Sequence, residues 1–538
     1  MLLMACAICQ IALTLYFNIF EAKNHIGIDS SWEYLKVIIA GKENSLFPIS
    51  SMHGTTHPEI ERLLVAVPLY KISGNLFLAY GLSNMIITLL SVYLLFKITK
   101  ALGYATPTIM IIINLFLCPY LSNGYDVQNE LGYYECVNGF SGYYNILVLT
   151  FLLVIYYFVS EIGKKRTVIG ILSFISLVYI SLCKGLGIIV WLGVPIVIYV
   201  LLDVFAQNDC AVLKKRKNLA SISFIVAMLL GRVLGAVIGL EYLDEGTYWI
   251  TVTDFYKNLG NILLGFALML GGIPGQGAYR SPTSFSGLVY GFGILIALVF
   301  YVAVTYIIIR ALREFYKSIR EKEYSDFYEK YDTDLFLGLI IVSTILVFAF
   351  VTPYKIGDIF SVRYLILPGV AGFILIGRLI EQINERFLIK RVMTILLFIC
   401  MVGLDLYSAY FIKTSDNSGL MVDELLASID EYDADLIYFW DTGKTLLDTE
   451  RVIRVVDTNR IYKCISNVDE LENFGDYKYY DDSTEYNGHT MMILLKDDID
   501  SLSEYTEGYT MVDEVGKYVL YYSEDNPIDL KNIVSNWK

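Results

Sequence analysis

Long apolar runs are the feature of this sequence that most constrains its fold. A helix of about 20 apolar residues crosses the hydrocarbon core of a bilayer. Lipid offers no hydrogen bonds to the backbone, so such runs must be helical. We therefore predict a polytopic α-helical membrane protein with about eleven transmembrane helices, at 2–20, 76–96, 107–121, 143–160, 167–183, 186–204, 220–240, 286–309, 335–352, 364–380 and 392–412.

The charges divide the chain into two regions. Residues 413–538 contain 11 Lys and Arg against 28 Asp and Glu, a net charge of −17, so residues 1–412 carry +3 of the total of −14. With 56% hydrophobic and 18% charged residues, the composition excludes an ordinary cytosolic enzyme, a disordered chain and a nucleic-acid binder. We predict a transmembrane domain at 1–412 and an acidic α/β domain at 413–538. Its expected elements are a helix at 419–432 and strands at 436–440, 452–456, 491–495 and 518–522.

The loops on one predicted side of the membrane carry more positive charge than the loops on the other side. Lys and Arg gather in every second loop, which by the positive-inside rule places those loops and the N-terminus in the cytoplasm. An odd number of spans then puts the C-terminal domain outside the cytoplasm. Three outside loops are long, at 21–62, 123–144 and 241–285. The last contains an apolar stretch, 261–272, that is expected to lie in the interface or to dip partway into the membrane.

The first outside loop holds candidates for acid–base chemistry. A helix from Ser30 onward would place Asp29 at its start and Glu33 one turn later on the same face. Anchored at the membrane surface by Trp32 and Tyr34, it would hold a carboxylate able to accept the proton of an attacking hydroxyl. The alternative is that Asp29 is simply the N-cap of a short interfacial helix.

Two histidines follow in the same loop. His53 and His57 form His-Gly-Thr-Thr-His with Pro58 directly after it. Pro58 disfavours a continuous helix here, and no cysteine or third histidine accompanies the pair, so we expect no metal site. His53 and His57 are instead expected in turns or in substrate contacts, and His57 and Arg62 could contact a lipid phosphate.

Cations are scarce in the outside loops. Arg280 follows a glycine-rich turn, and Lys355 and Arg363 precede the span that begins at Tyr364. Cations at this depth are costly unless paired, and they often mark a substrate path. The residues therefore indicate a phosphate site, or alternatively snorkelling and pairing with Asp358 and lipid headgroups.

Together these features resemble the GT-C superfamily of integral-membrane glycosyltransferases, which includes protein O-mannosyltransferases and lipid A aminoarabinose transferases. The resemblance covers about 1–412. It rests on Asp29 after the first span, on His57-Pro58, on Val-Pro-Leu-Tyr at 67–70 and on Arg-Tyr-Leu-Ile-Leu-Pro at 363–368. A soluble domain after the last span is also common in this superfamily.

The resemblance implies transfer of a sugar from a polyprenyl-phosphate donor to an extracytoplasmic glycan, lipid or protein. Asp29 would be the base, and Arg363, Lys355 and Arg280 would hold the lipid phosphate. Ser30 follows Asp29 where the best-known members have an acidic pair, and the loop has no Asp-x-Asp, so no divalent metal is implied. The remaining expected substrate-binding residues are Glu33, His53, His57, Arg62 and Tyr364.

Other functions stay open at this point. A transporter or flippase of lipid-linked glycans would need charges in mid-span and repeat symmetry. A polysaccharide polymerase or ligase would carry arginines in a large late outside loop, where 241–285 has only Lys257 and Arg280. A membrane scaffold could present the acidic domain to a partner.

Overall fold

The computed structural model divides the chain into two compact units. Unit 1 comprises Met1–Tyr16, Gly54–Glu61 and Asn84–Thr414, and unit 2 comprises Phe17–His53, Arg62–Ser83 and Ser415–Lys538. The residues that the structure describes are all except 26–27, 45–57, 121–132, 140–141, 143, 161–162, 185–186, 209, 238–248, 274–280, 323, 325–326, 328–329, 352–361, 384–386, 415–417, 442–451, 458–459, 467–469, 472–487, 504–505 and 526–538.

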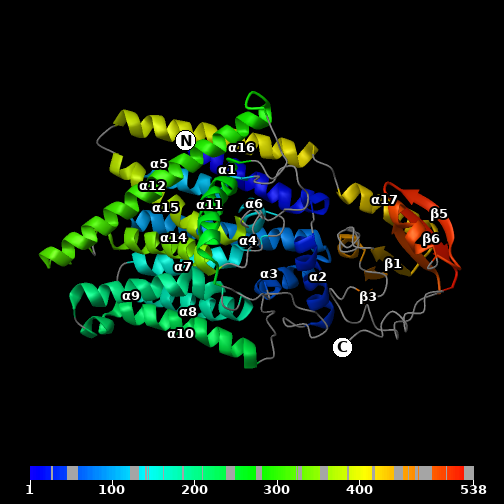
Figure 1. The fold of residues 1–538 in the computed structure, drawn as a ribbon, viewed down its shortest axis with the longest axis horizontal. Helices are drawn as coiled ribbons and strands as arrows, with labels where there is room; N and C mark the ends of the chain where they lie inside the picture. The colour runs from blue at the N-terminus through cyan, green and yellow to red at the C-terminus, as the bar shows by residue number, and fades with distance from the viewer. Residues whose placement is uncertain are drawn as a thin grey trace. The chain divides into compact units, whose positions relative to one another are not determined.

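Unit 1 is a bundle of helices (Figure 1). Its helices, with α4 shared between the units, are α1 (Leu2–Tyr16), α4 (Leu76–Ala101), α5 (Thr106–Leu117), α6 (Tyr133–Val137), α7 (Asn145–Val159), α8 (Lys164–Lys184), η3 (Ile189–Gly193), α9 (Val194–Gln207), η4 (Cys210–Lys214), α10 (Arg216–Val237), α11 (Val252–Met269), α12 (Phe285–Glu321), α14 (Asp332–Val351), η5 (Val362–Leu365), α15 (Ile366–Gln382) and α16 (Phe387–Thr414).

The predicted membrane class is confirmed. Within the described part of the chain, nine helical segments are long and apolar enough to cross a membrane. Each of the nine overlaps a predicted span, and the other two predicted spans coincide with the shorter apolar helices α5 and α7. The stretch predicted at 261–272 belongs to a longer helix, α11, which begins after Thr251, whose hydroxyl accepts from the Asp254 backbone N–H.

Helix α15 forms the centre of unit 1. Its side chains are buried on nearly every face from Ile366 to Ile380, and α5, α12 and α14 pack around it. A helix that is apolar all round must be surrounded by other helices. Close packing is possible because Gly372 leaves room for the ring of Phe300: a Cβ at Gly372 would lie 2.1 Å from that ring.

Helix α12 also packs directly against the backbone of the turn that ends α11. A Cβ added at Gly293 would lie 2.2 Å from the carbonyl carbon and oxygen of Gly271, in the turn that ends α11. Gly271 adopts a φ of +72°, in the left-handed region that favours glycine. Gly291 is on the same helix, and nothing lies within 4 Å of a Cβ built there.

The contrast predicts opposite effects of alanine at the two positions. Gly293→Ala must displace backbone, so it should destabilise the protein by roughly 1–3 kcal/mol. Gly291→Ala should be neutral or stabilising by up to about 1 kcal/mol, because alanine favours a helix. Thermal unfolding of the two purified variants in the same detergent tests this, and equal unfolding temperatures would contradict the predicted close approach.

Unit 2 contains an α/β domain. Its sheet has the strand order β3-β2-β1-β4-β6-β5, in which β2, β1 and β4 are parallel and the pairs β3–β2, β4–β6 and β6–β5 are antiparallel. Its elements are α17 (Ser418–Glu431), β1 (Leu436–Asp441), β2 (Ile461–Ser466), β3 (Glu470–Leu471), β4 (Thr490–Leu495), β5 (Thr510–Val515) and β6 (Tyr518–Ser523), with the short 3-10 turns η8 (Lys496–Asp498) and η9 (Asp500–Leu502) between β4 and β5.

The predicted elements of this domain are partly right. The helix and the strands at 436–440, 491–495 and 518–522 are confirmed as α17, β1, β4 and β6. The strand predicted at 452–456 is wrong, because those residues are helical. A run of five residues with Val452, Ile453 and Val455 buried has no period that separates strand from helix.

Unit 2 also includes helices that precede the second span. They are η1 (Phe17–Glu21), η2 (Ala22–His25), α2 (Ile28–Glu43) and α3 (Pro58–Ser73), of which α3 contributes to both units. Within this unit η2 packs against α17, and Lys23 Nζ lies 2.5 Å from the carboxylate of Asp423. Unit 2 therefore joins segments from both ends of the chain.

Candidate functional site

The structure describes part of the predicted site. It describes the side chains of Glu33, Arg363 and Tyr364, and it places Asp29 in α2 and Arg62 in α3 by their backbone. The other predicted site residues lie outside the described residues; they are His53, His57, Arg280 and Lys355.

Arg363 lies in η5, at the start of the segment that continues as α15. Its Nη2 donates a hydrogen bond to the Tyr364 hydroxyl over 3.3 Å, and its guanidinium carbon lies 5.1 Å from the centre of that ring. The half-buried cation is thus held against an aromatic face. A planar, permanently charged guanidinium held in this way is suited to bidentate recognition of a phosphate.

A second aromatic residue fixes the backbone at Tyr364. The indole Nε1 of Trp191, in the π-helical turn η3, donates to the Tyr364 carbonyl over 3.3 Å, and the two rings lie 6.2 Å apart. Phe348 packs on Tyr364 at 5.2 Å and Tyr144 meets Trp191 edge-on at 5.9 Å. Four rings from separate segments therefore position Arg363.

Helices α6 and α11 pack against η5, so two of the long loops that we predict to lie outside contribute helices next to the segment that contains Arg363. In α6, the Tyr133 hydroxyl donates to the Phe116 carbonyl over 3.0 Å. Burial raises the pKa of Tyr133 well above its usual value, so this tyrosine stays neutral. The Asn138 side-chain amide donates to the same carbonyl over 2.8 Å, which ties the loop to the end of α5.

In unit 2, helix α2 is confirmed and begins one residue before Asp29. Asp29 is therefore in the first helical turn, and Glu33, which is buried, lies one turn later. The predicted role of Tyr34 as an interfacial anchor is wrong: its ring is fully buried and stacks on Tyr80 at 4.0 Å. The described side chains from 31 to 40 are all buried, so α2 is a core helix.

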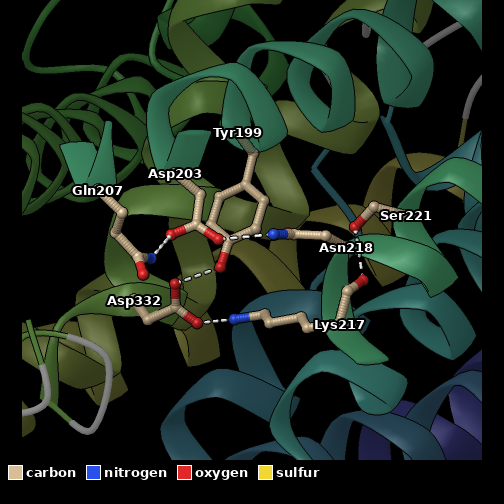
Figure 2. Close-up of polar contacts among 7 residues, drawn as sticks. All are labelled: Tyr199, Asp203, Gln207, Lys217, Asn218, Ser221 and Asp332. Carbon is tan, nitrogen blue, oxygen red and sulfur yellow. Dashed lines mark hydrogen bonds and ion pairs between the residues drawn. The ribbon is translucent and has the colours of Figure 1, made fainter. Parts of the chain in front are cut away.

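The sequence reasoning missed a polar cluster where α9 ends and α10 and α14 begin (Figure 2). The carboxylate of Asp332 pairs with Lys217 and accepts a hydrogen bond of 2.5 Å from the Tyr199 hydroxyl. The Asp203 carboxylate accepts from the amides of Gln207 and Asn218 over 2.5 and 2.6 Å. Figure 2 shows these side chains converging between the three helices.

Further ion pairs occur at helix ends in unit 1. Arg378 of α15 donates to Asp334 of α14 over 3.0 Å, and Lys390 of α16 lies 3.5 Å from Glu381 of α15. An acidic residue at the start of a predicted span, as at 332 and 334, was the available signal for these pairs. The loops predicted to be cytoplasmic supply most of the cations.

A buried carboxylate joins α16 to α1. Asp405 accepts two hydrogen bonds from the Gln10 amide, of 3.0 and 3.1 Å, and the Cys6 thiol lies 3.6 Å away. Asp405 was not predicted, because one acidic residue does not interrupt an apolar run. In the described chain, no three His, Cys, Asp or Glu side chains are grouped to hold a metal ion.

A fold with this bundle and a C-terminal α/β domain is known from polytopic membrane proteins. The chain is similar to two crystal structures of ArnT from Cupriavidus metallidurans. For the apo state the identity is 11% and the TM-score 0.57, with 98% of each chain covered. For ArnT bound to undecaprenyl phosphate the identity is 10% and the TM-score 0.56, with 97% of this chain and 99% of that chain covered.

The likeness confirms the predicted polytopic membrane fold with a C-terminal α/β domain, and it extends over nearly the whole chain. No protein-family model matches the sequence, and no curated protein matches it. The similarity to ArnT is therefore one of fold, at low sequence identity.

The polar cluster gives a prediction about stability. Asp332→Asn leaves the cation of Lys217 without its carboxylate in a largely buried place, which should cost about 3 kcal/mol. Glu321→Gln is a matched change in an exposed pair, 3.8 Å from Lys317, and should cost about 0.5 kcal/mol or less. Thermal unfolding in detergent measures both; a similar loss in the two variants would show that burial of the pair is unimportant.

Proposed function

We propose that this protein is a membrane glycosyltransferase that moves a sugar from a polyprenyl-phosphate donor to an extracytoplasmic acceptor. The observation that carries the proposal is the ArnT fold, which extends over 98% of both chains. One of the ArnT structures contains undecaprenyl phosphate, a polyprenyl phosphate. The acceptor is a cell-surface glycan, a lipid or a protein, and the donor's prenyl chain lies in the bilayer.

The phosphate is proposed to bind at Arg363. Departure of a polyprenyl phosphate from the sugar leaves two negative charges that a fixed cation stabilises best, because no reorganisation is needed during the reaction. Arg363 is held by Tyr364 and, through the backbone of Tyr364, by Trp191. Lys355 and Arg280 are proposed to assist it.

Asp29 is proposed as the base. Its backbone lies in the first turn of α2, with Glu33 one turn later. The carboxylate would accept the proton of the acceptor hydroxyl as that oxygen attacks the anomeric carbon and the bond to the phosphate oxygen breaks. Since the leaving group is good, positioning of the acceptor contributes much of the rate. Glu33, His53, His57, Arg62 and Tyr364 are proposed substrate contacts.

Replacing Asp29 tests the base. Asp29→Asn should lower kcat for sugar transfer by roughly 100-fold or more, since it removes the proton acceptor and keeps the size of the side chain. Asp254→Asn is the matched control, because Asp254 is also in the first turn of a helix, α11. The assay uses purified protein and defined polyprenyl-phosphate sugars. Full activity of Asp29→Asn would remove Asp29 from the mechanism.

Replacing Arg363 tests the phosphate contact separately. Arg363→Lys keeps the charge but loses the planar group held on Tyr364, so KM for the donor should rise about tenfold. Binding of undecaprenyl phosphate should weaken in parallel. Arg313→Lys, at an exposed position in α12, should change neither value. Unchanged donor binding in Arg363→Lys would exclude this residue from the phosphate site.

A further inference from the structure

Arg166 is a buried cation whose guanidinium has no hydrogen-bond acceptor among the residues that the structure describes. Only 8% of the residue is exposed, and its guanidinium carbon lies 4.7 Å from the centre of the Tyr157 ring. Within the described part of the chain, no group accepts a hydrogen bond from it or pairs with it, and its Nε is fully buried. An arginine side chain cannot lose its charge in a protein.

Charged groups of both signs surround Arg166. It lies in the first turn of α8, directly after Lys164 and Lys165. Helix α10 packs along α8 and also begins with basic residues; Lys217 is near enough for its charge to repel that of Arg166. Two carboxylates are also close: Asp332 pairs with Lys217, and the charge of Asp203 acts on Lys217 together with that of Arg166. The starts of two helices also carry partial positive charge, where cations are unfavourable and anions bind.

Aromatic rings pack against these cations. Tyr157 meets Phe224 of α10 edge-on at 5.3 Å, and Lys217 lies over the rings of Phe158 and Tyr199 at 5.4 and 4.9 Å. Rings favour a cation but do not neutralise it. Buried N–H donors without an acceptor are costly, so the guanidinium of Arg166 can gain by donating to an anionic ligand.

We propose that Arg166 is the centre of a binding site for the phosphate of an anionic phospholipid. The anion is a lipid headgroup because α8 exposes apolar side chains directly after Arg166, at Val168, Ile171 and Leu172, where acyl chains lie along a span. The predicted topology places this end of α8 in the cytoplasmic leaflet, which carries anionic lipids. The site is separate from Arg363 and independent of the transferase proposal.

The test compares Arg166→Gln with Lys164→Gln, which removes the same charge from an exposed position in the same helical turn. Each full-length variant is placed in nanodiscs of phosphatidylcholine, with or without phosphatidylglycerol, and its unfolding temperature and retained lipid are measured. Phosphatidylglycerol should raise the unfolding temperature of the native protein and of Lys164→Gln. Arg166→Gln should lose this increment and bind phosphatidylglycerol at least about tenfold more weakly, because charge-assisted hydrogen bonds are lost.

The stability of Arg166→Gln in neutral lipid distinguishes a ligand-binding role of Arg166 from a structural role. In phosphatidylcholine alone, Arg166→Gln should be as stable as the native protein or more stable, because a buried guanidinium without a hydrogen-bond acceptor has been removed. Unfolding of this variant in phosphatidylcholine would overturn the proposal, as would an unchanged phosphatidylglycerol increment. An equal increment from millimolar inorganic phosphate in phosphatidylcholine would overturn the assignment to a lipid.

Discussion

The structure of unit 1 depends on the inability of lipid to form hydrogen bonds. Every backbone group in a span must be satisfied within its own helix. The secondary structure of the spans is therefore set, and the fold is determined by how the helices pack. Helix α15 is central to this packing because other helices surround it. Glycine makes that packing possible at two places, where Phe300 contacts Gly372 and where Gly293 meets the backbone of Gly271.

Polar side chains inside the bundle are used where helices end. The pairs Lys217–Asp332 and Arg378–Asp334 join α10 and α15 to α14, and Asp203 joins α9 to α10 through Asn218. The carboxylates of these pairs are buried, so their partners on neighbouring helices satisfy them and hold the helices together. The same rule makes any buried donor without an acceptor informative, which is why Arg166 stands out.

The spans could be predicted because hydropathy, length and loop charge all depend on the membrane itself. Glu33 in the second turn of α2 also followed from spacing alone. Burial could not be predicted in this way. The sequence predicted Tyr34 to be an interfacial anchor, but it is a core residue. It predicted Arg166 to be one of several charges in a cytoplasmic loop, but its side chain is buried. In the C-terminal domain, residues 452–456 show that a short apolar run does not choose between helix and strand.

Cations of unit 1 lie beside carboxylates or aromatic rings, and Lys217 lies beside both. Lys217, Lys390 and Arg378 each have a carboxylate, and their charges hold helices together. Arg166 and Arg363 each lie on an aromatic ring. A carboxylate partner would compete with an incoming phosphate, whereas a ring orients the guanidinium and leaves its charge able to attract one. The orientation of Arg166 and Arg363 on aromatic rings is the shared feature on which the two proposed phosphate sites rest.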